Sequence, residues 1–104
     1  MTSDRRLSVS APARRDVRDI LQFTLVTWGE EKSDEYSRKL TSAIQHLVEH
    51  PEMGTARPDL FKGARILVVE HHVVFYRVEP DRVRIVRVLH EKSDASRVFK
   101  RSEP

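Results

Sequence analysis

The sequence lacks cysteine altogether, and only three of its 104 residues are glycine. Without cysteine the chain has no disulfide bond, no thiol nucleophile and no thiolate ligand for a metal ion. Long apolar runs are missing as well, because no segment approaches the roughly 20 residues that a membrane-spanning helix needs. The first residues lack the apolar stretch of a secretory signal. We therefore expect a soluble, cytoplasmic protein that works without a membrane, a metal or a cofactor.

Motifs of the common enzyme classes are also missing, including the glycine-rich phosphate loop and the G-x-S-x-G nucleophile turn. Residues 46–50, His-Leu-Val-Glu-His, do spell the H-x-x-E-H pattern of one zinc peptidase subgroup. The two apolar residues inside this pattern continue a buried helix stripe, so the other three face solvent, and Pro51 then ends the helix. The adjacent His71 and His72 point to opposite faces of an extended chain. We interpret the first pattern as a solvated helix end and the second as turn residues.

Charge is distributed unevenly along the chain, whose net charge is +3. Residues 1–54 contain 8 basic and 9 acidic side chains, a balance of −1, whereas residues 55–104 contain 11 and 7, a balance of +4. A positive field of this kind attracts acidic partners, either nucleic acid or an acidic protein surface. A merely solvated arginine-rich surface is the alternative interpretation, and charge alone does not choose between them.

The first half of the sequence predicts one short strand and two amphipathic helices. Apolar residues alternate with serine over residues 6–10 and predict a strand, and Ser10 is placed to cap a helix that carries Pro12 in its first turn. Gly29 separates this helix from a second one, which ends before Pro51. The expected buried stripes comprise Ala13, Val17, Ile20, Leu21, Thr24 and Trp28 on the first helix and Tyr36, Leu40, Ala43, Ile44, Leu47 and Val48 on the second.

The second half of the sequence changes to β character. Residues 51–63 contain several prolines and glycines and predict a loop. Eight of the 13 valines then lie between residues 68 and 88, and β-branched side chains favour strands. Residues 79–82 are typical of the tight turn of an antiparallel hairpin. We predict strands at residues 65–69, 73–78 and 83–89.

The predicted elements follow the order β-α-α-β-β-β. A sheet with one apolar face needs a helical hairpin to cover it. The predicted fold class is therefore α+β, with a helical hairpin packed as a second layer on a mainly antiparallel sheet. We treat residues 1–104 as a single domain with a core at about 6–94. Residues 95–104 are expected to form a polar, basic C-terminal tail, in which only Val98 and Phe99 are available to dock a short final helix.

Basic side chains interrupt the predicted strands and the loop before them. A cation within an apolar strand costs stability unless it is exposed or paired. Two interpretations stay open for each arginine: a contact to an acidic target, or a salt bridge to a nearby acid such as Glu70, Glu79, Asp81 or Asp94. The basic side chains that could converge on one surface are Arg57, Lys62, Arg65, Arg77, Arg87 and His90.

Several different short motifs occur along the chain in a specific order. They include Trp28-Gly29 between the helices, Val74-Phe75-Tyr76-Arg77 on one predicted strand and Arg87-Val88-Leu89-His90 at the end of the last. From Leu7 to about Asp94 the chain resembles the ParE branch of the RelE/ParE toxin superfamily. Further positions that carry the resemblance are Ala13, Asp16-Val17, Ile20, Tyr36, Leu40, Ile44, Leu47, His50-Pro51, Gly54, Arg57 and Gly63-Ala64-Arg65.

The resemblance implies the toxin component of a type II toxin-antitoxin system. Such a toxin is bound and neutralised by its cognate antitoxin, and we expect it to reach operator DNA only through that antitoxin. ParE-like members, which this chain resembles most closely, bind DNA gyrase, inhibit it and so block replication. RelE-like members instead cut messenger RNA on the ribosome. A degenerate, non-toxic member that only binds its antitoxin as a corepressor is a further alternative.

The two toxic activities need different residues. RNA cleavage without a metal needs a general base, a general acid and cations on the scissile phosphate. Similarity to RelE-like nucleases would assign His90 as acid or base and Glu52 as the base. Arg65, Arg77 or Arg87 would then supply the cations that bind the phosphate, with Arg65 and Arg87 preferred. The lysine cluster of other RelE-like nucleases is missing, since Lys62 is the only lysine between residues 40 and 91. We therefore favour gyrase inhibition without catalysis, with target contacts at Arg57, Arg65, Arg77, Arg87, His90 and Arg97.

Overall fold

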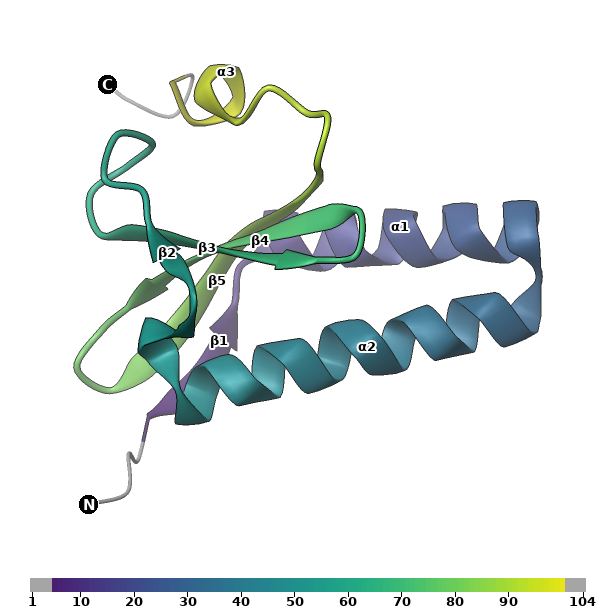
Figure 1. Cartoon of the computed structure of the whole chain (residues 1–104), viewed down its shortest axis with the longest axis horizontal. Helices are drawn as coiled ribbons and strands as arrows, with labels where there is room; N and C mark the ends of the chain where they lie inside the picture. The colour runs from purple at the N-terminus through teal and green to yellow at the C-terminus, as the bar shows by residue number, and fades with distance from the viewer. Residues whose placement is uncertain (1–4, 101–104) are drawn as a thin grey trace.

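The computed structural model describes residues 5–100 and folds them into a mixed α+β unit (Figure 1). The observed order is the predicted one, with two short additions in the loop after the second helix and a short helix at the end. The elements are β1 (Arg6–Val9), α1 (Ala11–Trp28), α2 (Glu30–Glu49), the 3-10 turn η1 (Pro51–Met53), β2 (Thr55–Ala56), β3 (Ala64–Val69), β4 (His72–Val78), β5 (Arg82–His90) and α3 (Ala95–Lys100).

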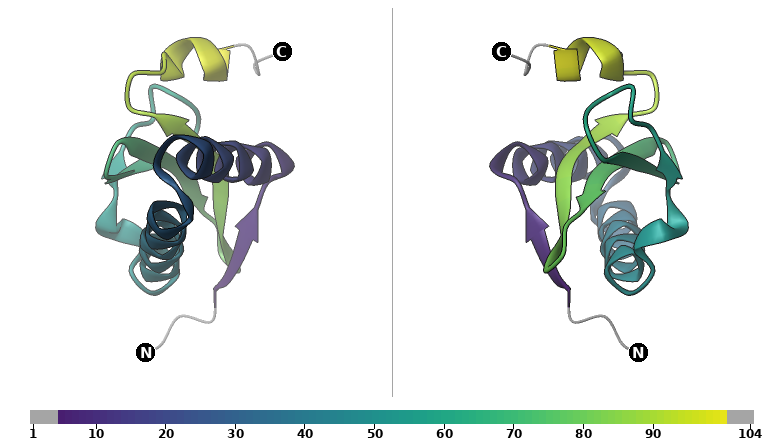
Figure 2. Two further views of the ribbon diagram at one scale, coloured as in Figure 1. Left: turned by 90° about the vertical axis from the view of Figure 1, so that its right-hand side faces the viewer. Right: turned by 90° about the vertical axis from the view of Figure 1, so that its left-hand side faces the viewer.

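The five strands form one sheet in the order β1-β5-β4-β3-β2. The pairs from β5 to β2 are antiparallel, whereas β1 runs parallel to β5 at one edge. α1 and α2 form a hairpin on one face of this sheet (Figure 2). The prediction of a helical hairpin on a mainly antiparallel sheet is therefore confirmed. Within residues 5–100 no helix combines the length and apolar character needed to cross a membrane.

Ser10 joins β1 to α1 and bonds to both the helix and the sheet. Its hydroxyl caps α1 by accepting from the backbone N–H of Ala13 at 3.1 Å, and Pro12 occupies the first turn, as predicted. The same hydroxyl donates to the carbonyl of Val86 at 2.8 Å. The backbone N–H of Ser10 donates to the carbonyl of Ile85 at 3.0 Å. The start of α1 is thereby fixed against β5.

The turn between α1 and α2 consists of a single residue, Gly29. Its φ of +99° lies in a region that residues with a side chain rarely adopt. Glu30 and Glu31 follow in the first turn of α2, where negative charge interacts favourably with the helix dipole. The hydroxyl of Ser33 also donates to the carbonyl of Leu21 at 3.2 Å. These features fix α1 and α2 as an antiparallel pair.

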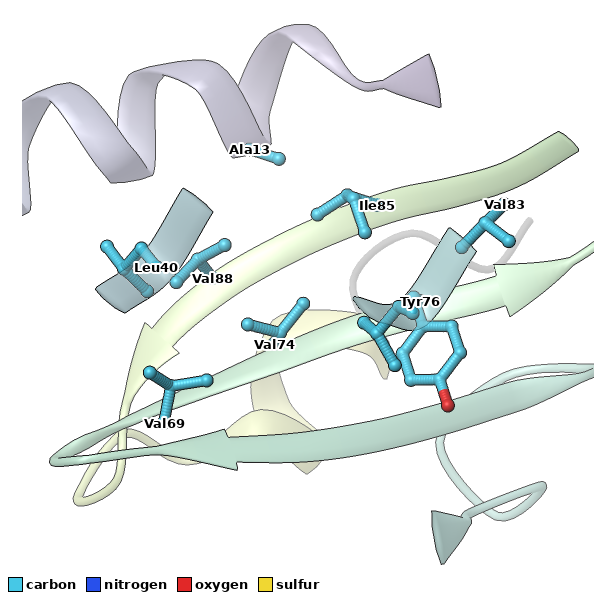
Figure 3. Packing of buried hydrophobic residues seen from close by; sticks show 9 residues of the cluster. Ala13, Leu40, Val69, Val74, Tyr76, Val83, Ile85 and Val88 are labelled. Carbon is cyan, nitrogen blue, oxygen red and sulfur yellow. The ribbon is translucent and has the colours of Figure 1, made fainter. Parts of the chain in front are cut away.

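The main hydrophobic core fills the space between the helical hairpin and the sheet (Figure 3). Leu40 and Leu47 of α2 are 2% and 0% exposed. Val17, Ile20 and Ile44 pack around them as partly buried neighbours, so most of the two predicted helix stripes is confirmed. The buried members of this core are Ala13, Leu40, Leu47, Val69, Val74, Tyr76, Val83, Ile85 and Val88.

The far end of α1 departs from the prediction. The sequence places Trp28 on the buried stripe, yet its side chain is 69% exposed. The helical hairpin extends past the sheet (Figure 1), so the last turns of α1 have no strand beneath them. Phe23 and Val26 in the same region are 66% and 74% exposed. Periodicity identifies the inner side of a helix, but it does not indicate how far the sheet reaches under it.

A second apolar cluster occupies the other face of the sheet, which corrects the prediction of a single apolar face. The ring of Phe99 on α3 lies 4.9 Å from that of Phe61 and 5.0 Å from that of Phe75, measured between centroids. The predicted final helix does form, and the folded unit extends to Lys100, past the expected core boundary near residue 94. Residues 101–104 of the predicted tail lie outside the described part. The buried members of this cluster are Leu60, Ala64, Phe75, Leu89 and Phe99.

The segment 51–63 contains more structure than the predicted loop. Besides η1, the two-residue strand β2 pairs with β3 at the edge of the sheet. The buried hydroxyl of Tyr76 donates to the carbonyl of Pro51 at 2.7 Å and accepts from the N–H of Gly54 at 2.9 Å. A side chain at Gly54 would collide with the carbonyl of Ile66 and with the Tyr76 hydroxyl. This close approach fixes the segment against the middle of the sheet.

The core assignment predicts unequal effects for two large side chains. Leu40→Ala should lower the free energy of unfolding by about 2–5 kcal/mol, because it removes buried contacts and leaves a cavity. Trp28→Ala deletes a larger but exposed side chain and should change stability by about 0.5 kcal/mol or less. Chemical denaturation of the two variants measures both values. Equal losses of stability in the two variants would contradict a structure in which the sheet covers Leu40 on α2 but does not reach the end of α1.

Candidate target-binding surface

Arg87 lies at the open edge of β5 and forms a paired contact with α1. Its Nε and Nη2 donate to the two carboxylate oxygens of Asp16 at 2.7 and 3.0 Å. Asp16 also accepts from the backbone N–H of Val88 at 3.0 Å. Both side chains are largely shielded, and the hydrogen bond that Arg87 donates to Asp16 raises the pKa of Arg87 above its usual value. Arg87 therefore holds α1 to β5 through Asp16, which is not one of the acids that the sequence suggests as salt-bridge partners.

Arg65 is bound to the protein backbone. Its Nη2 donates to the carbonyls of Glu52 at 3.1 Å and Gly54 at 2.6 Å. Its Nε is buried and has no hydrogen-bond partner within residues 5–100. With η1 and the start of β3, the side chain lines a hollow of about 330 Å³. Arg65 thus stabilises the bend after α2 and presents only part of its guanidinium to this hollow.

Arg57 and Arg77 are each paired with an acid two residues away. Arg57 donates from Nε and Nη2 to Asp59 at 2.9 Å in both contacts, and this hydrogen bonding lowers the pKa of Asp59 below its usual value. Arg77 donates from Nε and Nη2 to one oxygen of Glu79 at 3.1 and 2.8 Å. Both arginines remain substantially exposed. The salt-bridge interpretation therefore holds for Arg77 with Glu79, while both side chains can still contact a partner.

Arg97, His90 and Glu52 are exposed. Arg97 is on α3, where its backbone N–H donates to Asp94. His90 ends β5, and its Nδ1 accepts from the backbone N–H of Lys92 at 3.1 Å. Glu52 lies in η1, where its carbonyl but no atom of its carboxylate bonds to Arg65 among the described residues.

The sheet register separates the predicted acid-base and cationic residues. Arg65 pairs with Tyr76 on one side of β4, whereas His90 pairs with His72 on the other side. Tyr76 and His72 are four residues apart, which corresponds to about 13 Å along a strand. Glu52 contacts the Arg65 end through its backbone. The structure therefore brings Glu52 and Arg65 together but places His90 near the opposite end of β4.

Three histidines gather at the end of β4 where His90 lies. The His72 ring lies 5.3 Å from the His90 ring, and its Nδ1 is 2.5 Å from the hydroxyl of Tyr36. Burial, and then the neighbouring His90 and His71, lower the pKa of His72 below its ordinary value of 6.5. Burial, and then Glu70, raise the pKa of Tyr36 to about 12. His72 is a strand residue, which corrects its interpretation as a turn residue, whereas His71 does occupy the turn.

The H-x-x-E-H pattern lies on the surface at the end of α2. His46, Glu49 and His50 are exposed, as predicted. Within residues 5–100 no three side chains of metal-ligating type gather closely enough to bind a metal ion.

Sequence reasoning missed three features of this surface. Asp16 lies directly before Val17, a residue of the inner stripe of α1. No local sequence pattern connects it with Arg87, which is 71 residues away. Tyr36 and His72 belong to different halves of the chain and meet only because β4 runs beneath α2. Arg84 was not singled out, although it lies on the same sheet face as Arg77. Each of these contacts depends on strand register, for which a single sequence gives a weak signal.

The Asp16–Arg87 contact predicts a position-specific loss of stability. Asp16→Asn should lower the free energy of unfolding by about 2 kcal/mol or more, because it leaves Arg87 without its counter-charge. Asp19→Asn is the matched control, since Asp19 is an exposed acid on the same helix, and it should cost about 0.5 kcal/mol or less. Thermal and denaturant unfolding measure both. If the two variants were equally stable, the contact would be unimportant for the fold.

The shifted pKa of His72 predicts a loss of stability in weak acid. Its pKa is below 6.5 in the folded state, so below about pH 6.5 the unfolded chain binds a proton that the folded chain does not. The free energy of unfolding should therefore fall between pH 7 and pH 5. The carboxylates with lowered pKa values, Asp59, Asp81 and Glu91, act only at lower pH. Urea titrations should show a flatter pH profile for His72→Asn, whereas the exposed control His46→Asn should keep the slope.

Comparison with known proteins agrees with this fold. The sequence matches the family of the ParE toxin of type II toxin-antitoxin systems over residues 7–95. It is 40% identical to toxin ParE1 of Caulobacter vibrioides over 87 residues, 84% of this chain and 90% of that protein. It is 32% identical to toxin ParE1 of Mycobacterium tuberculosis over 93 residues, 88% and 95% of the two chains. A chain of the chromosomal ParDE system from P. aeruginosa superposes with a TM-score of 0.73 at 22% identity, covering 84% of this chain and 96% of that one. Because the family match covers most of the sequence and the folds agree, this chain belongs to the ParE toxin family.

Proposed function

We propose that this type II toxin inhibits DNA gyrase by binding and thereby blocks replication. Its place in the ParE family supports an inhibitor of this type. The observation that carries the proposal is the separation of Glu52 and Arg65 from His90 along β4. A metal-independent nuclease needs its base, acid and phosphate-binding cations around one phosphodiester. A binding inhibitor has no such requirement.

The contact surface that we propose is the basic second half of the chain. Arg57, Arg77, His90 and Arg97 present exposed or half-exposed side chains to a partner. Arg65 and Arg87 contribute chiefly by fixing η1 and α1, because their guanidinium groups already bond within the protein. Exposed guanidinium groups suit contact with an acidic protein surface, since their planar donors match carboxylates. The acidic partner would be a surface of gyrase.

The partner of this toxin family is an antitoxin, and the exposed end of the helical hairpin offers it a surface. Phe23, Val26 and Trp28 are each more than 60% exposed, an unusual concentration of large apolar side chains on one helix. We infer that an antitoxin segment covers this region and extends along α1, α2 and the sheet. Operator DNA would be reached through the antitoxin, and all of these partners would meet the toxin in the cytoplasm.

One pair of assays separates inhibition of gyrase from messenger RNA cleavage. Purified toxin should impair supercoiling by gyrase in a reaction without ribosomes. His90→Ala should leave most of that effect, because no proton transfer is required of His90. A nuclease would instead cut translated messages, and the same change would slow cutting by about 100-fold or more.

A contradicting outcome, a growth assay and a control variant complete this test. Unchanged supercoiling together with ribosome-dependent cleavage would replace the proposed function with the nuclease alternative. Growth of cells that express the toxin without its antitoxin distinguishes a gyrase inhibitor or a nuclease from a corepressor. A corepressor would not arrest growth. His46→Ala provides a matched histidine change on the opposite layer, at an exposed position of α2.

A further inference from the structure

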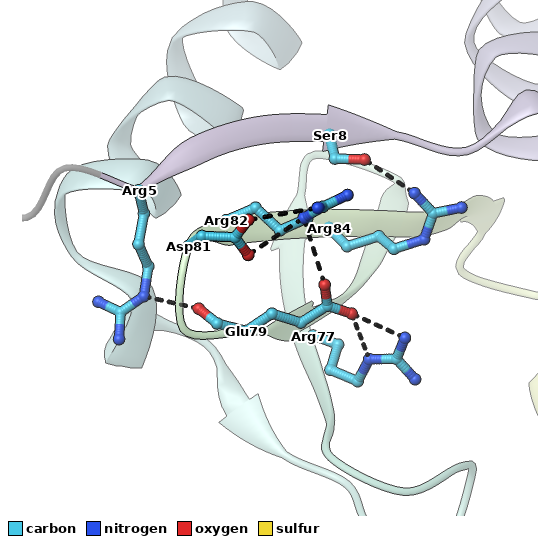
Figure 4. Close-up of polar contacts among 7 residues, drawn as sticks. All are labelled: Arg5, Ser8, Arg77, Glu79, Asp81, Arg82 and Arg84. Carbon is cyan, nitrogen blue, oxygen red and sulfur yellow. Dashed lines mark hydrogen bonds and ion pairs between the residues drawn. The ribbon is translucent and has the colours of Figure 1, made fainter.

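The turn between β4 and β5 carries a cluster of charges on the sheet face opposite α1 and α2 (Figure 4). Arg77 of β4 and Arg84 of β5 are direct cross-strand partners, and Arg84 also pairs with Ser8 of β1. Side chains of directly paired residues point to the same face of a sheet. Arg82, Glu79 and Asp81 complete the cluster at the turn. Arg5 donates to the backbone carbonyl of Glu79 at 2.9 Å, and the strands and the turn contribute three further arginines but only two carboxylates.

The two carboxylates are both occupied by the other two arginines. Glu79 accepts from Arg77 at 2.8 Å and lies 3.5 Å from Arg82. Asp81 accepts from Arg82 at 3.3 Å, and this hydrogen bond lowers the pKa of Asp81 below its usual value. Arg84 has no acidic partner within residues 5–100. Its positive charge is therefore left uncompensated beside the like charge of Arg77.

Arg84 is nevertheless held in one position. Its Nη1 donates to the Ser8 hydroxyl at 2.8 Å, and the side chain points toward Ser8 and away from the Asp81 carboxylate (Figure 4). The residue as a whole is half-buried, so part of its surface is already withdrawn from water before any partner arrives. Its Nε and Nη2 make no hydrogen bond within the described residues. A fixed cation with unused parallel donors is suited to a two-pronged contact with a carboxylate.

We propose that Arg84 anchors one carboxylate of an acidic surface on the toxin's target protein, with Arg77 beside it as a second cation. This inference rests on the proposed function and identifies the central contact of the binding surface. Binding would supply the missing counter-charge and relieve the repulsion between the two paired arginines. Fully desolvated arginine contacts of this kind often dominate the energy of an interface.

The surrounding charges favour a protein carboxylate over the backbone of a nucleic acid. Glu79 and Asp81 lie among the arginines of this cluster, so the surface is not a continuous row of cations of the kind that suits a strand with a negative charge at every nucleotide. A single aspartate or glutamate would instead meet the unused Nε and Nη2 of Arg84, whose Nη1 faces Ser8 (Figure 4). The partner is therefore expected to present an isolated acid rather than a continuous anionic chain.

The test compares Arg84→Gln with Arg38→Gln in the complete toxin. Arg38 is exposed on α2 in the other layer, so the control has the same chemical change on the remote face. Supercoiling by the gyrase holoenzyme is titrated with each protein. Arg84→Gln should raise the concentration needed for inhibition by at least about 10-fold, as expected for a desolvated charge contact. Arg38→Gln should stay within about twofold of the wild type.

Arg84→Lys guards against a loss that comes merely from unfolding. It keeps the positive charge but lacks the planar fork of donors, and it should inhibit at concentrations between those of the wild type and Arg84→Gln. Melting temperatures near that of the wild type show that the variants fold. Wild-type potency of both Arg84 variants would overturn the proposal.

Two further outcomes separate this inference from the proposed function. If the wild type leaves supercoiling unchanged, inhibition of gyrase fails, and growth arrest becomes the readout for the same variants. Arrest that is lost in Arg84→Gln but kept in Arg38→Gln then supports the anchor on another acidic target, whereas equal arrest overturns it. The last measurement is binding of the toxin to a DNA duplex of about 20 base pairs. Tight binding to it that disappears in Arg84→Gln would make the anion a phosphate and refute the carboxylate.

Discussion

The fold depends on the way in which α1 closes the open edge of β5. β1 pairs with β5 only as far as Ile85, and beyond that residue the backbone of β5 needs other partners. The backbone N–H and the hydroxyl of Ser10 donate to the carbonyls of Ile85 and Val86, respectively. The carboxylate of Asp16 accepts from the N–H of Val88. These bonds come from the first two turns of α1. The helical hairpin is therefore attached to the sheet by directed polar contacts as well as by the apolar core beneath it.

This attachment changes the meaning of the basic composition. Arg87 balances the charge of Asp16, and Arg65 bonds to two backbone carbonyls, so neither contributes a fully available cation to the surface. The +4 balance of the second half overstates the positive charge that a partner meets. What matters is which guanidinium groups have donors left over, and that distinction follows from hydrogen bonds rather than from composition.

The helices and the central strands could be predicted because their signals are local. The cap at Ser10, the break at Gly29 and the valine-rich strands follow from periodicity and backbone preference, and the structure confirms them within one or two residues. The exposure of Trp28 depends on where the sheet ends, and the burial of Phe99 depends on a second apolar face. The partners of Arg87 and His72 lie on distant segments. These features arise from tertiary register, which local sequence patterns do not encode.

The parallel pairing of β1 with β5 has a consequence for synthesis of the toxin. Ser8 and Arg84 are 76 residues apart, so the first strand has no partner in the sheet until β5 has been made. Until then the helical hairpin has no completed sheet to cover, and α1 lacks the contacts of Ser10 and Asp16. Pairing between such distant segments is slow to form. A nascent chain therefore cannot complete this sheet, or fix α1 against it, before β5 has been made.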